Sequence, residues 1–144
     1  MLPLSAIKHV CFDVEDIEAA EKLMEGLLGV SSTGINTMTV DGGKGKVRTA
    51  FFHLEKGSIE LAQHDLPPSW EGSPLKTPHG FHHVGFETDL FDEALATLAE
   101  KGINPLPGFP MDTGHSRVAF LNPEKTCGIL IELHDSAYTP HNPQ

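Results

Sequence analysis

The sequence predicts an α+β fold made of two copies of one βαβββ module. The first observation is an internal repeat, in which three segments of the first half return in the same order in the second half. The paired segments are 8–14 with 82–88, 47–51 with 116–120, and 59–61 with 131–133. Repetition of this kind indicates one supersecondary unit used twice. The second observation is that each copy passes from strand-like alternation to helical spacing and back.

The first copy opens with a strand and a helix. Apolar residues alternate with polar ones over 7–14, as in a half-buried strand. Asp16 stands where a helix N-cap would be, and Gly29 stands where a left-handed residue would end that helix. The remaining strands of this module are expected near 35–40, at 47–54 and at 57–63.

The second copy repeats this order of a strand and a capped helix. A strand is expected at 82–88, followed by a helix with Asp89 as its N-cap and Gly102 as its end. The remaining strands are expected near 103–107, at 116–121 and at 128–134. The sequence therefore predicts the same order of elements in both copies.

A chain of 144 residues is long enough for one hydrophobic core, so we expect a single domain over 1–144. Module one covers about 5–66 and module two about 80–136. The segment 67–79 between them is rich in proline and glycine, which is typical of a linker.

Composition excludes several classes of partner. A net charge of −10 argues against nucleic-acid binding, which needs a basic surface. No stretch of 18 apolar residues is present, so we expect no membrane span. Two cysteines are too few for a disulfide scaffold and indicate a reducing cytoplasm. A homodimer is the expected assembly.

The parity of residues along each predicted strand brings four side chains to one face. Side chains alternate across a strand, so residues of one parity share a face. In four strands the apolar residues take one parity, and a histidine or glutamate takes the other. These residues are His9, Glu60, His83 and Glu132. If each sheet curls, their common face lines a half-open barrel.

Two imidazoles and two carboxylates form a ligand set for one borderline divalent ion, such as Mn, Fe, Co, Ni or Zn. The spacing from histidine to glutamate is 51 residues in the first copy and 49 in the second, as expected for equivalent positions. Four protein ligands leave room for substrate oxygens. The sequence therefore predicts a metal site in which the ion is a Lewis acid toward a carbonyl or enolate oxygen.

Other polar residues are candidates for contacts near this site. Arg48 and Arg117 are equivalent in the two copies, and their parity is expected to place them on the lining face. There they would bind a substrate carboxylate or phosphate, or else form salt bridges with surrounding acidic residues. His115 precedes the strand at 116–121 and is either a candidate to contact substrate or itself a structural or surface residue. His134 shares the parity of Glu132 and is a candidate to orient it.

The remaining histidines and cysteines are assigned no functional role. Cys11 is expected to be a small buried residue, Cys127 a loop residue, and His82 a packing or surface residue. The other histidines are expected to be solvated, namely His53, His64, His79 and His141.

The stretch 119–133 reads Ala-Phe-Leu-Asn-Pro-Glu-Lys-Thr-Cys-Gly-Ile-Leu-Ile-Glu-Leu. Its proline, turn, glycine and apolar run ending in Glu-Leu resemble methylmalonyl-CoA epimerase, a family of the vicinal oxygen chelate (glyoxalase/bleomycin resistance/dioxygenase) superfamily. The resemblance covers nearly the whole chain. It implies that His9, His83 and Glu132 are metal ligands and that Glu60 fills a fourth position, often Gln in epimerases. It also implies a catalytic Glu shortly before Val47, where Asp41 is the only carboxylate.

The resemblance implies a metal-dependent epimerase or isomerase that removes a proton α to a thioester or ketone carbonyl. Asp41 or Glu132 would be the base. A lactoylglutathione-lyase-like enzyme is an alternative, favoured by Glu60 and disfavoured by the turn at 122–128. An extradiol dioxygenase is disfavoured because its site holds only one carboxylate. A metal-free protein that binds a small molecule or confers resistance is an alternative of another class.

Overall fold

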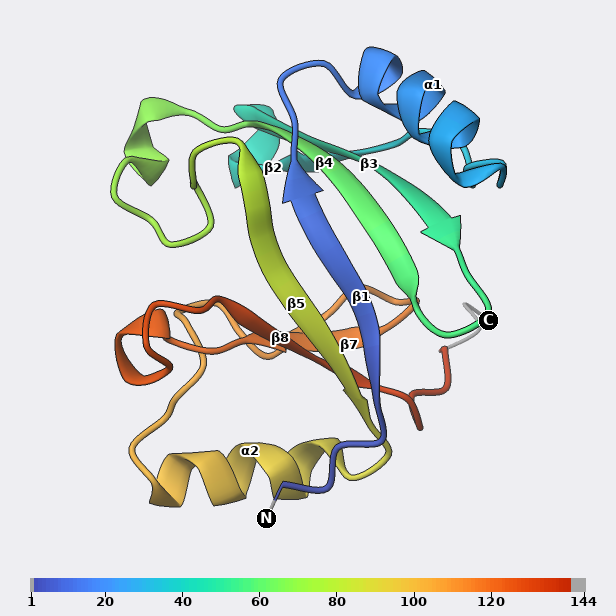
Figure 1. The fold of residues 1–144 in the computed structure, drawn as a ribbon. Helices are drawn as coiled ribbons and strands as arrows, with labels where there is room; N and C mark the ends of the chain where they lie inside the picture. Colours follow the sequence, from blue (N-terminus) through green and yellow to red (C-terminus); the bar gives the residue numbers. More distant parts are fainter. Residues whose placement is uncertain (1, 141–144) are drawn as a thin grey trace. The chain divides into compact units, whose positions relative to one another are not determined.

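The computed structural model describes residues 2–140, so His141 lies outside the described residues. The chain divides into two units, one of residues 9–82 and the other formed by residues 83 onward with the segment before His9. The boundaries fall inside strands β1 (Ala6–Asp13) and β5 (Gly80–Thr88). Each half of the chain has the element order βαβββ (Figure 1), which confirms the predicted α+β class and its repeated module.

The unit of residues 9–82 contains a mixed sheet and one helix. After β1 come α1 (Ile17–Leu28), β2 (Asn36–Val40), β3 (Gly45–His53) and β4 (Ser58–Asp65). The strands lie in the order β2-β3-β4-β1; β1 is parallel to β4, and the other neighbours are antiparallel. Helix α1 contacts β3 and β4 (Figure 1).

Helix α1 begins and ends where the sequence predicts. The Asp16 carboxylate accepts a hydrogen bond from the Ala19 N–H at 3.0 Å. Gly29 has φ 66°, and its N–H donates to the Glu25 carbonyl at 2.9 Å. Residues between these caps pack the helix onto the sheet in a core of Ile17, Ala50, Phe52 and Leu61.

The second unit repeats this arrangement. After β5 come α2 (Phe91–Glu100), β6 (Met111–Asp112), β7 (Arg117–Phe120) and β8 (Ile131–Asp135), with strand order β5-β8-β7-β6. Its core comprises Phe91, Ala94, Leu98, Ala119, Leu121 and Leu133. The N-terminal segment belongs to this unit, since Leu2 packs against that core and the Thr88 hydroxyl donates to the Pro3 carbonyl at 2.7 Å.

Two local predictions in the second copy are wrong. Asp89 does not cap α2, because Leu90 is the N-cap residue and no side chain makes a capping hydrogen bond to this helix. The strand expected near 103–107 is reduced to a single bridge between Pro105 and Leu121, and pairing resumes only at β6. A proline has no N–H to donate to a ladder, which limits pairing at this point.

The predicted linker holds a short 3-10 turn, Pro68–Trp70. Among residues 2–140, neither helix has the length and apolar character needed to cross a bilayer.

Candidate functional site

The unit of residues 9–82 holds a buried pair of His9 and Glu60. His9 Nε2 lies 3.1 Å from Glu60 Oε2, and the side chains are 2% and 12% exposed. Cys11 is the β1 partner of Glu60, so His9 lies one step along the same face of the sheet. Phe51 is the β3 partner of Glu60, and its ring meets the His9 ring edge-on at 6.0 Å between centroids.

The second unit holds the equivalent pair of His83 and Glu132. His83 Nε2 lies 3.6 Å from Glu132 Oε1, and the side chains are 5% and 10% exposed. Gly85 is the β5 partner of Glu132, and Phe120 is its β7 partner. The Phe120 ring meets the His83 ring edge-on at 5.0 Å. Each unit therefore builds the same histidine, glutamate and phenylalanine arrangement from its own strands.

The predicted faces of these strands are confirmed within each unit. Ile59 and Leu61, which flank Glu60, pack into the core beneath α1. Ile131 and Leu133, which flank Glu132, pack into the core beneath α2. The glutamates consequently face away from the helices. Burial of a carboxylate is costly unless it is paired or binds a cation, so each arrangement is chemically suited to hold part of a metal's ligand set.

The two arrangements differ two positions after the glutamate. His134 Nε2 forms a short hydrogen bond with Glu132 Oε1, and the His134 side chain is 13% exposed. The equivalent residue two positions after Glu60 is Ala62, which cannot form such a bond. The imidazole of His134 therefore has no counterpart at the equivalent position of β4.

Arg48 does not lie on the lining face, so its predicted position is wrong. Its parity on β3 is that of Ala50 and Phe52, which pack beneath α1. The guanidinium forms a bidentate pair with Glu18 of α1, with Nη1 3.2 Å from Oε2 and a shorter contact from Nη2 to Oε1. This pair raises the pKa of Arg48 and lowers the pKa of Glu18.

Arg117 is likewise on the helix side, and its predicted position is wrong. Its Nη2 donates to Asp92 of α2 and to Asp135 of β8, both at 2.9 Å. Its guanidinium carbon lies 4.6 Å from the centre of the Phe91 ring. The hydrogen bond to Asp92 is the main cause of a raised pKa of Arg117. For both arginines the salt-bridge alternative is the one that the structure contains.

Asp41 is not brought to the pair of His9 and Glu60. It opens a 3-10 turn, Asp41–Gly43, has φ 51°, is exposed, and accepts a hydrogen bond from the Ser69 hydroxyl at 3.4 Å. Val40 pairs with Gly45, whereas Glu60 pairs with Phe51, six residues further along β3. At the usual rise of a strand, Gly45 and Phe51 are about 20 Å apart along β3.

His115 is exposed in the turn between β6 and β7, where its N–H donates to the Thr113 hydroxyl at 3.3 Å. A role for its side chain in binding substrate stays a prediction. Of the residues assigned no functional role, Cys11 is fully buried and Cys127 is an exposed loop residue, as expected, while His53 is exposed at the end of β3.

Sequence reasoning missed a cluster around Asp13 in the unit of residues 9–82. His64 Nδ1 and His79 Nδ1 lie 2.6 and 2.7 Å from the two oxygens of this buried carboxylate. Burial alone would raise the pKa of Asp13, but the two hydrogen bonds lower it below its ordinary value. The prediction of a solvated His64 is therefore wrong. A usable signal existed, because Asp13 shares the parity of His9 and His64 shares that of Glu60.

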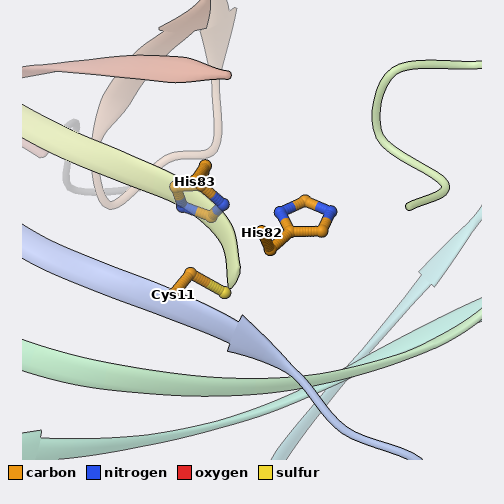
Figure 2. A group of neighbouring side chains, drawn as sticks. All are labelled: Cys11, His82 and His83. Carbon is orange, nitrogen blue, oxygen red and sulfur yellow. The ribbon is translucent and has the colours of Figure 1, made fainter. Parts of the chain in front are cut away.

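His82 extends this cluster. Its ring stacks on that of His64 at 4.5 Å between centroids, and its Nε2 donates to the Leu75 carbonyl at 2.7 Å. Figure 2 shows His82 and the next residue, His83, on β5, together with Cys11 of β1. The Cys11 Sγ and a ring nitrogen of His82 lie within 4.8 Å of each other. These contacts anchor the segment before β5 to the strands of its unit.

Comparison with known proteins places this chain in a family. Residues 8–120 match the profile of the glyoxalase/bleomycin resistance protein/dioxygenase superfamily. The chain is 27% identical over 145 residues to the uncharacterized protein YqjC of Bacillus subtilis, covering 96% of this chain and 98% of that one. It is 29% identical over 140 residues to the mitochondrial methylmalonyl-CoA epimerase of Dictyostelium discoideum, covering 92% of this chain and 79% of that one.

Solved structures agree with this placement. The fold is similar to that of methylmalonyl-CoA epimerase from Mycobacterium tuberculosis, with a TM-score of 0.75 and 21% identity over 93% of this chain and 89% of that one. A methylmalonyl-CoA epimerase in complex with methylmalonyl-CoA and NH4+ gives a TM-score of 0.71 and 27% identity over 97% of this chain and 99% of that one. The chain belongs to the glyoxalase/bleomycin resistance protein/dioxygenase superfamily.

Proposed function

We propose that this protein is a metal-dependent epimerase or isomerase that removes a proton α to a thioester carbonyl. The observation that carries the proposal is the repeated arrangement of a buried histidine, glutamate and phenylalanine, once in each unit. Such repetition supports a shared role for the two pairs.

We assign His9, Glu60, His83 and Glu132 as the ligands of one divalent ion. Neutral imidazoles and carboxylates together suit Mn, Fe, Co, Ni or Zn. Within each unit, the separations of 3.1 and 3.6 Å between donor atoms are close to those between neighbouring ligands of one ion. When bound, such an ion stabilises negative charge on a carbonyl or enolate oxygen.

Glu132 is assigned as the base. Its carboxylate takes the proton from the α-carbon, the electron pair of the C–H bond moves into the enolate, and the proton returns to the carbon. Return on the opposite face inverts the centre, and this requires a second acid. Asp41 is not assigned this role, because it lies at the far end of the β2–β3 hairpin from Glu60.

The substrate class is supported by relatives. Methylmalonyl-CoA epimerase of Streptomyces coelicolor has been solved with 2-nitronate-propionyl-CoA, and this chain is 27% identical to one such structure over 96% of its length. We therefore propose a thioester of coenzyme A as the first substrate to test. The protein is further proposed to act in the cytoplasm as a homodimer.

The test is solvent exchange. The metal-loaded protein is incubated with methylmalonyl-CoA in deuterium oxide, and the mass of the acyl group is followed beside a Glu132→Gln variant. The proposal predicts incorporation of deuterium at the α-carbon by the wild type only. No incorporation by a protein shown to hold its metal would reject this substrate, and equal incorporation by the variant would reject Glu132 as the base.

A lactoylglutathione-lyase-like reaction is a second candidate, because Glu60 stands at a position that is often Gln in epimerases. This reaction moves a proton between adjacent carbons of a hemithioacetal. Turnover of the adduct of methylglyoxal with glutathione, without exchange in methylmalonyl-CoA, would favour it. The same metal-loaded preparation serves both assays.

A further inference from the structure

The two halves of the candidate centre are not chemically equivalent. Glu60 has its histidine neighbour at 3.1 Å and Ala62 two residues later on the same face of β4. Glu132 has His83 at 3.6 Å and is bonded more closely by His134. His134 is thus an imidazole bonded to Glu132 that has no counterpart two positions after Glu60.

His134 lies beside Glu132 on β8. Both residues lie on the same face of β8, two positions apart, and both side chains are nearly buried. The neighbours of His134 across the sheet are Val118 on β7 and Glu87 on β5. Glu87 pairs with Lys8 at 3.3 Å.

A carboxylate without a fixed partner can rotate between several arrangements around an ion. A hydrogen bond from a neighbouring imidazole to one oxygen removes that freedom and determines the orientation of the other. Because base geometry requires contact with the proton to be removed, a fixed carboxylate is better suited to proton transfer than a mobile one.

We propose that His134 is a positioning residue that holds Glu132 by a hydrogen bond to Oε1, and that this bond orients the Glu132 carboxylate to move the substrate proton. The proposal rests on the proposed function for the proton-transfer part only. The effect of His134 on the geometry of the metal ligand is independent of which substrate is used.

Three variants test it. His134→Leu removes the donor and keeps an apolar side chain of moderate size, whereas His134→Gln keeps an N–H that can donate. Asp135→Asn is the control, because it alters the next residue of β8, which bonds Arg117 on the helix side. Each is compared with wild type for Co2+ affinity by equilibrium dialysis and for kcat and KM of deuterium exchange.

We expect His134→Leu to bind Co2+ about 10–100-fold more weakly and to lose a similar factor in kcat, with KM for the thioester unchanged. His134→Gln should recover most of both losses. Asp135→Asn should lower thermal stability while leaving Co2+ affinity and kcat as in wild type.

Equal Co2+ affinity and kcat in His134→Leu and wild type would overturn the proposal. Equal losses in the Leu and Gln variants would also overturn it, since the hydrogen bond would then not be the cause. A wild type that binds Co2+ but exchanges no proton would reject the proposed reaction, while the Co2+ affinities of the three variants would still decide the positioning role.

Discussion

His64 Nδ1 lies 2.6 Å from Asp13 Oδ1, and this contact joins the end of β4 to the end of β1 on the face opposite α1. A carboxylate only accepts hydrogen bonds, so the imidazole donates. His79 donates to the other oxygen at 2.7 Å and ties the segment before β5 to the same residue. Asp13 therefore organises three parts of the unit that also contains His9 and Glu60.

This contact predicts a stability that depends on pH. The pKa of Asp13 is lowered by its two imidazole partners, against the opposing effect of burial. A carboxyl group with a lowered folded-state pKa stabilises the fold at pH values above its unfolded pKa of about 4, and the contribution is lost as pH falls through the folded value. Asp13→Asn should lower the free energy of unfolding by roughly 1–3 kcal/mol at pH 7.

Urea unfolding of wild type and Asp13→Asn from pH 7 to pH 3 checks this prediction. The gap between the two proteins should narrow as the pH falls below about 4. Asp89→Asn is the control, because Asp89 is exposed and should leave stability unchanged throughout. A gap that is constant over the whole range would show that the charge of Asp13 is not the source of the effect.

The arginines are predicted to act on stability and not on substrate binding. Arg117→Ala should lower the free energy of unfolding by about 1–3 kcal/mol, because it removes the two hydrogen bonds that Arg117 donates to Oδ2 of the nearly buried Asp135 carboxylate. Arg48→Ala should have a smaller effect, since its partner Glu18 is 59% exposed. Both variants should keep the KM of wild type. A raised KM in either would instead support the substrate contact expected from the sequence.

The two helices are predicted to respond differently to loss of an aspartate near their start. Asp16→Ala should cost about 1 kcal/mol, because it removes the acceptor of the Ala19 N–H. Asp89→Ala should cost little, because the Thr88 hydroxyl binds the start of α2. Thermal unfolding of both variants measures the difference. Equal losses would contradict the cap assignment in α2.

Removing the two candidate bases is predicted to separate their roles. Glu132→Gln should lower the rate of α-proton exchange by about 10²–10⁴-fold, the usual contribution of a positioned base. Asp41→Asn should leave the rate as in wild type, because Asp41 is exposed in its turn and remote from Glu60 along β3. Loss of exchange in the Asp41 variant would return that residue to the catalytic role implied by the family resemblance.

Much of this fold could be predicted from the sequence because the sequence contains two copies of one module. The parity of Glu60 between Ile59 and Leu61, and of Glu132 between Ile131 and Leu133, determined which face each glutamate occupies. Parity was misapplied to Arg48 and Arg117, whose strands carry core residues at the same parity. The meeting of Asp13 with His79 depends on a tertiary contact between residues 66 positions apart, which no local pattern encodes.

The central proposal is that His9, Glu60, His83 and Glu132 are ligands of one divalent ion. Mass spectrometry of the metal content, on protein purified without chelator or affinity metal, tests it most directly in wild type, His9→Ala and His83→Ala. The account predicts about one ion per chain in wild type and loss of that ion in either variant. An ion that survives one of the two substitutions would contradict a shared site. A wild type that stays empty even with added Mn, Co, Ni or Zn would favour a metal-free binding protein.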